Sequence, residues 1–183
     1  TIKSLTSYRT ESHPNMLWLE VETKEGVIGL GETFYAAEAV ESYIHSNLAP
    51  IVLGMPALDI GFIHNLTKPY IGFVAASVEM RARSALDIAL WDALGKVTHQ
   101  PLSVLLGGRI REKIPIYNTC AGSRYARGPK VGKIENYGIQ TPTQTNQYED
   151  LYLFLNDPVG LAGSLLDMGI DSMKIWPFDF AAK

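Results

Sequence analysis

The sequence predicts an α+β fold in two parts: an antiparallel sheet followed by helices, and then the first strands of a parallel β/α arrangement. Three observations support this prediction. Strand-like segments separated by short turns begin the chain, a long apolar helix follows, and a strand–helix–strand order ends it. We place the boundary between residues 1–110 and 111–183. One βαβ unit cannot bury both faces of its sheet, so the second part is expected to be incomplete.

Three strands are expected at the start of the chain, over residues 2–9, 15–23 and 27–32. The second strand alternates apolar and polar residues, which is the pattern of a half-buried strand. The turn before the third strand contains a glycine that can take positive φ. Within the third strand, Gly29 and Gly31 predict a bulge or the close approach of another backbone.

Apolar residues at helical spacing predict helices over residues 36–52, 58–67 and 78–98, followed by a short helix over residues 101–106. Proline opens the last of these and two glycines close it, as is typical of helix starts and ends. The helix at 78–98 is apolar on nearly every side. We therefore expect it to be buried on several faces.

Two carboxylates, Asp87 and Asp92, interrupt this apolar helix. An acid in such surroundings requires a partner, because burying an unpaired charge is costly. Arg81 and Arg83 lie on the same helix, so structural ion pairs among these four residues are expected at the domain boundary.

The last third of the chain is expected to contain a strand at residues 113–119, a helix at 148–168 and a strand at 172–176. Such a crossover begins either a parallel barrel or a doubly wound sheet. Residues 123–147 are polar and rich in Gly, Pro, Thr and Asn. They are too many for an ordinary connection, which predicts a lid or surface loop.

Composition excludes several classes of function. The chain is 46% hydrophobic and 19% charged, which is typical of a globular protein. A net charge of −3 without a cluster of Lys and Arg argues against a nucleic-acid partner. No apolar run is long enough to span a membrane, so no membrane partner is expected. The single cysteine, Cys120, cannot form an internal disulfide and fits the reducing cytoplasm.

Residues 84–96 and 100–108 resemble the helical signature of the mandelate racemase and muconate lactonizing enzyme family of the enolase superfamily. Residues 29–33 resemble the third strand and capping loop of that family. Residues 169–179 resemble the second barrel strand of its sugar-acid-dehydratase-like branch. The resemblance implies a capping domain followed by a modified (β/α)₈ barrel. A barrel usually needs about 250 residues, so residues 111–183 would form only its start.

The resemblance also implies a reaction. Enolase-type enzymes remove a proton α to a carboxylate, and a divalent metal, usually Mg²⁺, stabilises the enediolate. In the family the metal ligands lie on the third, fourth and fifth barrel strands. Those strands are not expected within residues 1–183, so the resemblance implies Mg²⁺ with ligands outside this chain, and we expect no metal ligand among these residues.

Lys174 and Trp176 occupy the positions at which many family members have Lys-x-Lys. The second lysine of that motif is a general base, and a tryptophan cannot accept the proton. This difference argues against a racemase with two opposed bases. Both side chains point to the same face of the strand. Lys174 is therefore a catalytic candidate that could bind the substrate carboxylate, with Trp176 beside it as a substrate-binding candidate. Alternatively, Lys174 forms a salt bridge with a later acid.

By position in the family, the loops at residues 10–15 and 32–36 close over the barrel mouth. His13, Thr33 and Tyr35 are the substrate-binding candidates in these loops, although each could be an ordinary loop residue. Asn118 follows the first barrel strand. It could bind substrate oxygens, or it could cap the strand and satisfy loop backbone.

The resemblance and the missing second lysine favour a Mg²⁺-dependent lyase that dehydrates a sugar acid by α-proton abstraction and loss of hydroxide from the β carbon. Two alternatives remain open. One is a racemase, epimerase or cycloisomerase of the same superfamily. The other is a non-catalytic fragment without a metal site, which acts only by assembly. The resemblance implies two partners, an acid sugar and further copies of the same protein.

Overall fold

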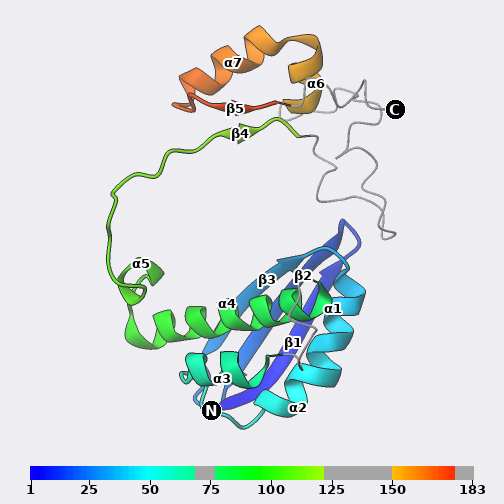
Figure 1. The fold of residues 1–183 in the computed structure, drawn as a ribbon, viewed down its shortest axis with the longest axis vertical. Coiled ribbons are helices and arrows are strands. Elements are labelled where there is room, and N and C mark those ends of the chain that lie inside the picture. The colour runs from blue at the N-terminus through cyan, green and yellow to red at the C-terminus, as the bar shows by residue number, and fades with distance from the viewer. Residues whose placement is uncertain (69–76, 122–149, 176–183) are drawn as a thin grey trace. The chain divides into compact units, whose positions relative to one another are not determined.

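A computed structural model describes residues 1–68, 77–121 and 150–175 of the chain. The chain separates into two compact units, Thr1–Ile110 and Arg111–Lys183, which are coloured from blue to green and from green to red in Figure 1. The predicted loop at residues 123–147 and the candidate Trp176 lie outside the described residues.

The first unit contains a three-stranded antiparallel sheet in the order β1-β2-β3. β1 spans Ile2–Thr10, β2 His13–Thr23 and β3 Ile28–Phe34. The predicted meander is therefore confirmed. β2 begins before its predicted limit because His13 pairs with Thr10 of β1, and β3 ends beyond its predicted limit because Phe34 pairs with Met16 of β2.

Helices follow the sheet at the places that the apolar spacing predicts. They are α1 (Ala37–Tyr43), the π-helix η1 (Ile44–Leu48), α2 (Ala49–Val52), α3 (Ile60–Leu66), α4 (Val78–Thr98) and α5 (Leu102–Leu105). The first three are continuous along the chain. The π-helical pattern is seen at its end, where Ala49 N–H donates to Ile44 O five residues earlier, and the next residue, Pro50, has no amide hydrogen.

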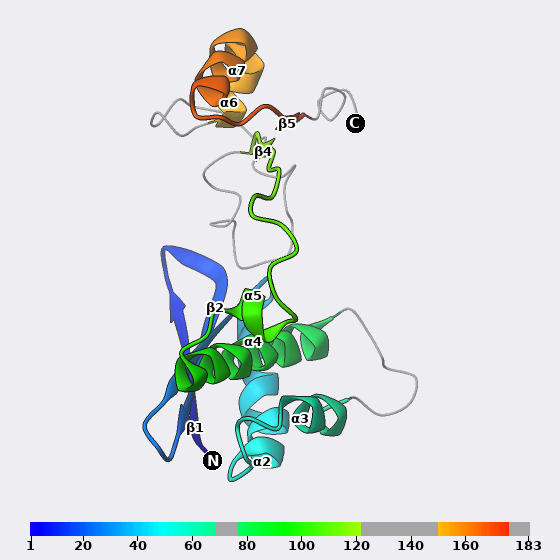
Figure 2. The same cartoon turned by 90° about the vertical axis from the view of Figure 1, so that its left-hand side faces the viewer.

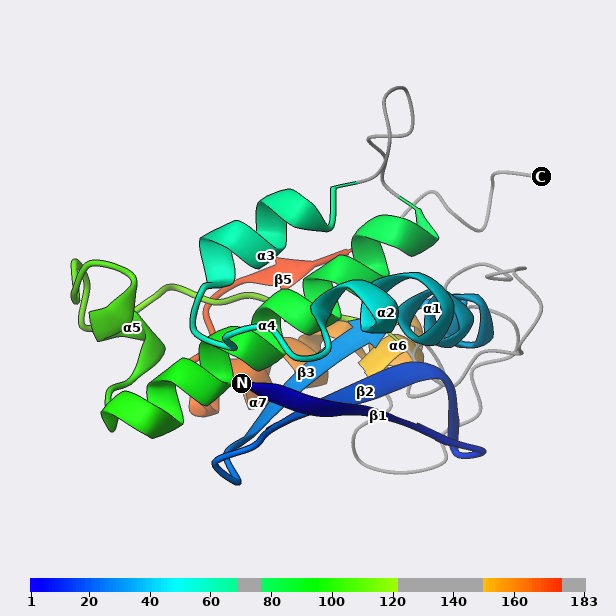
Figure 3. The ribbon, with the colours of Figure 1, turned by 90° about the horizontal axis from the view of Figure 1, so that it is seen from below.

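α4 runs across one face of the sheet, with α1 beside it (Figures 1 and 3). Gly29 and Gly31 make this approach possible, because a Cβ at either position would overlap the α4 backbone at Ala89 and Ala85 respectively. The predicted close approach of a second backbone is thus confirmed. Figure 2 shows the sheet on one side of the unit and α2 and α3 on the other.

The core of the first unit lies between the sheet and these helices. It combines the inward residues of β2 with one face of the helical run and one face of α4. Its largest fully buried side chains include Leu17, Leu19, Ile44, Leu86 and Leu90.

One side of α4 also covers the edge of the sheet. Leu30 N–H donates to Asp92 Oδ2 at 2.7 Å, and Lys96 Nζ donates to Ile28 O at 2.7 Å. Asp92 and Lys96 form an ion pair at 2.7 Å. The expected pairing of the α4 acids with arginines of the same helix was wrong for Asp92, because the backbone of β3 and Lys96 lie within its reach.

The second unit pairs two short strands in parallel, β4 (Asn118–Thr119) and β5 (Met173–Lys174). α6 (Asp150–Asn156) and α7 (Pro158–Asp167) lie on one side of this pair (Figure 1). The parallel pairing agrees with the expected crossover, although both strands are shorter than predicted. Its described core consists of Cys120, Leu161 and Leu165, with partly buried neighbours.

The prediction of one helix at residues 148–168 was wrong. Pro158 has no amide hydrogen, and Asp157 stands before it as an N-cap whose Oδ1 accepts from Gly160 N at 2.9 Å. The backbone of Asp157 leaves the helical region (φ −145°, ψ 65°), so two helices form. None of the helices in the described part of the chain is both long and apolar enough to cross a membrane.

Candidate functional site

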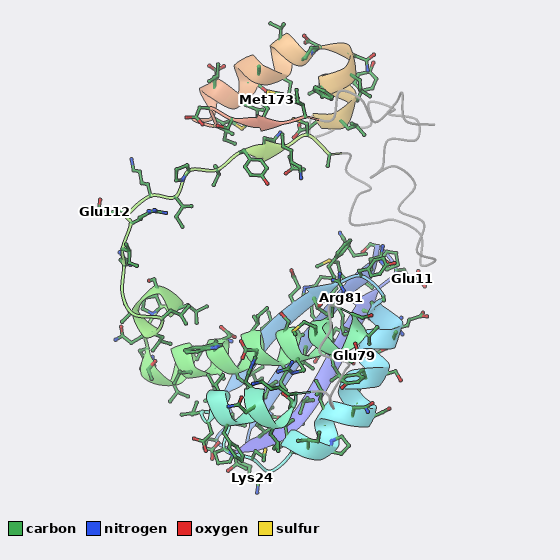
Figure 4. The ribbon with its side chains drawn as sticks, in the orientation of Figure 1. Glu11, Lys24, Glu79, Arg81, Glu112 and Met173 are labelled. Carbon is green, nitrogen blue, oxygen red and sulfur yellow. The ribbon has the colours of Figure 1, made fainter. Side chains whose placement is uncertain are left out.

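Three of the predicted site residues lie at one end of the first unit. His13 begins β2, Thr33 stands near the end of β3, and Tyr35 follows that strand. Tyr35 N–H donates to Asn15 O at 2.8 Å, which ties the end of β3 to the start of β2. Figure 4 shows Glu11, in the β1–β2 turn, at the same end of the unit as Arg81, with Lys24 at the opposite end.

The connection from β3 to α1, which we call the β3–α1 corner (residues 34–36), has an uncommon backbone. Tyr35 has φ 78° and Ala36 has φ 53°, so two successive residues other than glycine adopt left-handed conformations. Each such residue costs about 1–2 kcal/mol because its Cβ approaches the neighbouring carbonyl. A corner of this kind persists only when the surrounding structure holds it.

Arg81, in α4, contacts the β3–α1 corner twice. Its Nη1 donates to Phe34 O, and its guanidinium lies over the Tyr35 ring, 5.3 Å from the ring centroid. Sequence reasoning missed this role and assigned Arg81 to an ion pair with an acid. One signal was available: a cation near the N-terminus of a helix opposes the helix dipole, and so it needs a favourable contact elsewhere.

The rest of this end of the unit is held by polar contacts between β1 and α1. Arg9 forms ion pairs with Glu38 at 3.1 Å and with Glu41 at 2.8 Å. Ser7 Oγ donates to Glu41 Oε1 at 2.8 Å, and the Ser12 hydroxyl shares a hydrogen bond of 2.9 Å with His13 Nδ1. Exposed pairs of this kind contribute little stability, but they fix where α1 begins relative to the β1–β2 turn.

Arg83 lies two residues after Arg81 on α4 and is buried at 6% exposure. Its Nη2 donates to His64 O at 3.0 Å, and its Nε donates to Thr67 Oγ1 at 3.4 Å. These acceptors lie at the C-terminal end of α3, where a cation is favourable. Arg83 therefore joins α3 to α4, and Asp87 faces His64 at 3.8 Å instead of pairing with an arginine.

In the second unit the structure does not bring Asn118 and Lys174 together. Asn118 is in register with Met173, and Lys174 is in register with Thr119. Because side chains alternate along a strand, Asn118 and Lys174 point to opposite faces of the β4–β5 pair. Asn118 Nδ2 donates to Asp150 Oδ2 at 2.9 Å, so its amide links β4 to the start of α6.

Cys120 follows β4 and is fully buried. Burial raises the pKa of its thiol, and the negative charge of Asp150 raises it further. The thiolate is the reactive form of cysteine, so this environment disfavours a nucleophilic role. No three His, Cys, Asp or Glu side chains within residues 1–68, 77–121 and 150–175 are grouped so as to hold a metal ion.

Comparison with protein families gives one match that covers more than half of the chain. Residues 3–107 match the model of the N-terminal domain of mandelate racemase / muconate lactonizing enzyme. The matched range contains the sheet of the first unit except Ile2, all the helices of that unit and the β3–α1 corner.

Three curated proteins resemble the chain at similar levels. A chloromuconate cycloisomerase of Cupriavidus pinatubonensis is 34% identical over 113 residues, which are 57% of this chain and 29% of that protein. A D-mannonate dehydratase of Novosphingobium aromaticivorans is 37% identical over 114 residues, 61% of this chain and 28% of that protein. A D-galactonate dehydratase of Cronobacter sakazakii is 34% identical over 127 residues, 68% of this chain and 32% of that protein. The chain thus spans less than a third of the length of these relatives.

Two solved structures extend the comparison. An enolase of the mandelate racemase subgroup from Agrobacterium tumefaciens is 40% identical with a TM-score of 0.75, and the match covers 100% of this chain and 40% of that one. An enolase from Pantoea ananatis with bound D-gluconate and Mg is 30% identical with a TM-score of 0.60, over 68% of this chain and 31% of that one.

Proposed function

The chain belongs to the mandelate racemase / muconate lactonizing enzyme family of the enolase superfamily, and we propose on this basis that it is the N-terminal part of a Mg²⁺-dependent enzyme that dehydrates a sugar acid. The observation that carries the proposal is the sequence identity of 34–37% with two relatives named as dehydratases of sugar acids. Both names describe removal of water from a polyhydroxy carboxylic acid.

In this proposal, residues 1–110 are the capping domain and residues 111–183 begin the barrel. The separation of the chain between Ile110 and Arg111 supports the division. The parallel pairing of β4 with β5, with helices on one side, supports the start of a barrel, in which every strand is parallel to its neighbours. The Mg²⁺ ligands would belong to residues other than those described in this chain.

The proposed reaction breaks two bonds of the substrate. A base removes the proton on the carbon next to the carboxylate, and the electron pair then expels hydroxide from the following carbon, which takes up a proton from a general acid and leaves as water. The resulting enol becomes a 2-keto-3-deoxy acid. The chain would contribute His13, Thr33 and Tyr35 from the capping domain, which contact and enclose the substrate. Lys174 would bind the carboxylate, and we propose Trp176 as a further substrate-binding residue.

The test is an assay of the complete protein that contains this chain. It is incubated with Mg²⁺ and a panel of aldonic and aldaric acids, and 2-keto-3-deoxy products are measured as semicarbazones. The proposal expects one or a few acids to be converted and EDTA to stop the conversion. Absence of keto product with every acid, despite binding of Mg²⁺, would reject dehydration.

The role of Lys174 has a matched control in the same unit. Lys174→Met should lower kcat/KM by about 100-fold, because a lost charge at the reacting carboxylate affects the transition state directly. Lys113→Met removes another exposed lysine of the second unit and should leave the kinetics unchanged. If the two variants had equal activity, the proposed role of Lys174 in the site would be rejected.

One relative favours a second candidate. The similarity of 34% to a chloromuconate cycloisomerase fits an enzyme that rearranges its substrate without losing water. Mass spectrometry of the product separates the two reactions, since dehydration removes one water and isomerisation leaves the mass unchanged. The third possibility, a protein that acts only by assembly, would show neither product. We also propose that the protein is cytoplasmic. We further propose that it assembles with further copies of itself, and sedimentation would test this assembly.

A further inference from the structure

We propose that Arg81 is a positioning residue that holds the β3–α1 corner in the conformation in which Tyr35 is presented to the substrate. The effect of Arg81 on catalysis rests on the proposed function. The contacts by which Arg81 restrains the corner lie within the first unit and do not depend on that function. Arg81 would not touch the substrate. It acts through Tyr35 and the backbone of Phe34.

The corner needs a restraint because its backbone is unfavourable on its own. Tyr35 and Ala36 are both left-handed, and neither is a glycine. α1 begins directly afterwards, with Val40 N–H donating to Ala36 O at 3.0 Å, so the corner also sets the start of that helix. If the corner relaxed, both the position of Tyr35 and the first turn of α1 would change.

The restraints come from two elements on either side of the corner. β2 supplies Asn15 O, which accepts from Tyr35 N–H at 2.8 Å. α4 supplies Arg81, which donates to Phe34 O and stacks on the Tyr35 ring at 5.3 Å. Arg81 of α4 therefore holds both the backbone of Phe34 and the side chain of Tyr35.

The position of Arg81 on α4 supports a role beyond stability of the helix. It lies one turn from the N-terminus, where a cation opposes the helix dipole. Glu79, in the first turn, has its Oε2 buried without a hydrogen-bond partner among the described residues, so this oxygen forms no hydrogen bond with Arg81. Arg81 instead contacts the corner, through Phe34 O and the Tyr35 ring.

The chemistry of the contact requires an arginine. A guanidinium can donate in its plane to a carbonyl while its face lies on an aromatic ring, which an ammonium group cannot do at the same time. A lysine at this position keeps the charge but loses one of the two contacts. The Arg81→Lys variant should therefore restore only part of what Arg81→Met loses.

The experiment uses the complete protein with three variants: Arg81→Met, Arg81→Lys and Lys96→Met. Lys96 is the matched control, because it is also an α4 cation that donates to a β3 carbonyl, that of Ile28, and it lies far along α4 from the corner. Hydrogen–deuterium exchange over residues 34–36 and steady-state kinetics with the preferred acid are measured for each.

We expect Arg81→Met to exchange the Tyr35 amide about 10-fold faster and to raise KM about 10-fold with a smaller change in kcat, since substrate contact is lost before the chemical step. Arg81→Lys should lie between this variant and the wild type. Lys96→Met should change neither the exchange rate of the Tyr35 amide nor KM. A purely structural role would instead lower the melting temperature of Arg81→Met and Lys96→Met alike and leave KM unchanged.

Three results would overturn the inference: unchanged exchange at Tyr35 in Arg81→Met, faster exchange there in Lys96→Met to the same extent, or wild-type KM in a folded Arg81 variant. If Arg81→Met does not fold, Arg81→Lys decides between the same outcomes. Failure of the proposed function is distinguishable, because the wild type would then convert no sugar acid while exchange at the corner still reports on Arg81.

Discussion

The two units differ in how much of their apolar surface is covered within the unit itself. Among the described residues, all of the largest fully buried side chains except Leu151 belong to the first unit. In the second unit Val159 is 82% exposed, and Ile114 is 76% exposed. Antiparallel strands joined by short turns complete their ladder locally, whereas parallel strands need helices on both faces and further strands beside them. A capping domain can thus be closed within a hundred residues, while the start of a barrel cannot.

The largest expected effect tests the packing of α4 on β3 at Gly31, where the two backbones come closest. Gly31→Val should destabilise the unit by about 3 kcal/mol or more, because any Cβ at this position overlaps Ala85 O and must displace α4. Urea unfolding followed by tryptophan fluorescence measures the change.

The control for this substitution is Gly61→Ala. A Cβ at Gly61 meets nothing within 4 Å and the residue lies inside α3, so stability should rise by about 0.5–1 kcal/mol. If Gly31→Val unfolded at the wild-type urea concentration, the close packing of α4 on β3 would be wrong.

The same truncation in each core compares the units directly. Leu86→Ala should cost about 3 kcal/mol, because Leu86 is buried in the large core of the first unit and its removal would leave a cavity there. Leu165→Ala should cost only about 1–2 kcal/mol, since its small core can collapse more easily. Hydrogen exchange resolved by unit measures both. Equal losses would show that the second core is as well packed as the first.

A smaller effect concerns the break between α6 and α7. Asp157→Ala removes the N-cap of α7 and should cost about 1 kcal/mol, seen as faster exchange at Gly160 N–H. Asp167→Ala, at the opposite end of the same helix, should be neutral or slightly stabilising, because an acid there opposes the helix dipole. An effect of the same sign at both ends would argue against capping as the cause.

The smallest effect is a dependence on pH in the second unit. Burial raises the pKa of the Cys120 thiol in the folded state, so its contribution to stability is complete below the ordinary thiol pKa and is lost as pH rises towards the raised value. Stability relative to Cys120→Ala should therefore fall between about pH 8 and 10, where an ordinary thiol titrates. Alkylation by iodoacetamide at pH 8 should be slow before unfolding and fast after it. Fast alkylation of the native protein would contradict the burial of the thiol.

Much of the first unit could be predicted from sequence because its signals are local. The apolar spacing of α4 predicted residues 78–98, which are the observed bounds. Gly29 and Gly31 predicted a close backbone approach, which α4 makes. In the second unit the signal was present but overlooked: an aspartate before a proline is a common helix start, and Asp157 and Pro158 divide the expected helix.

The β3–α1 corner could not be predicted in the same way. Tyrosine and alanine rarely adopt the left-handed backbone conformation, so the identities of Tyr35 and Ala36 do not predict it. The residue that contacts them, Arg81, is 47 positions from its acceptor Phe34 and comes from another element. The opposite orientation of Asn118 and Lys174 depends likewise on strand register, which the sequence of one strand does not contain. Roles for His13 and Thr33 stay predictions until substrate contacts are measured.

The contacts of α4 with β3 have a consequence for how copies of this protein meet. β3 is an edge strand, and an edge with free amides and carbonyls is a template for pairing with a strand of another molecule. Asp92 and Lys96 occupy the amide of Leu30 and the carbonyl of Ile28. Both residues lie within the segment that resembles the family signature. Asp92 and Lys96 would therefore limit aggregation through the β3 edge. Association between copies would then use other surfaces.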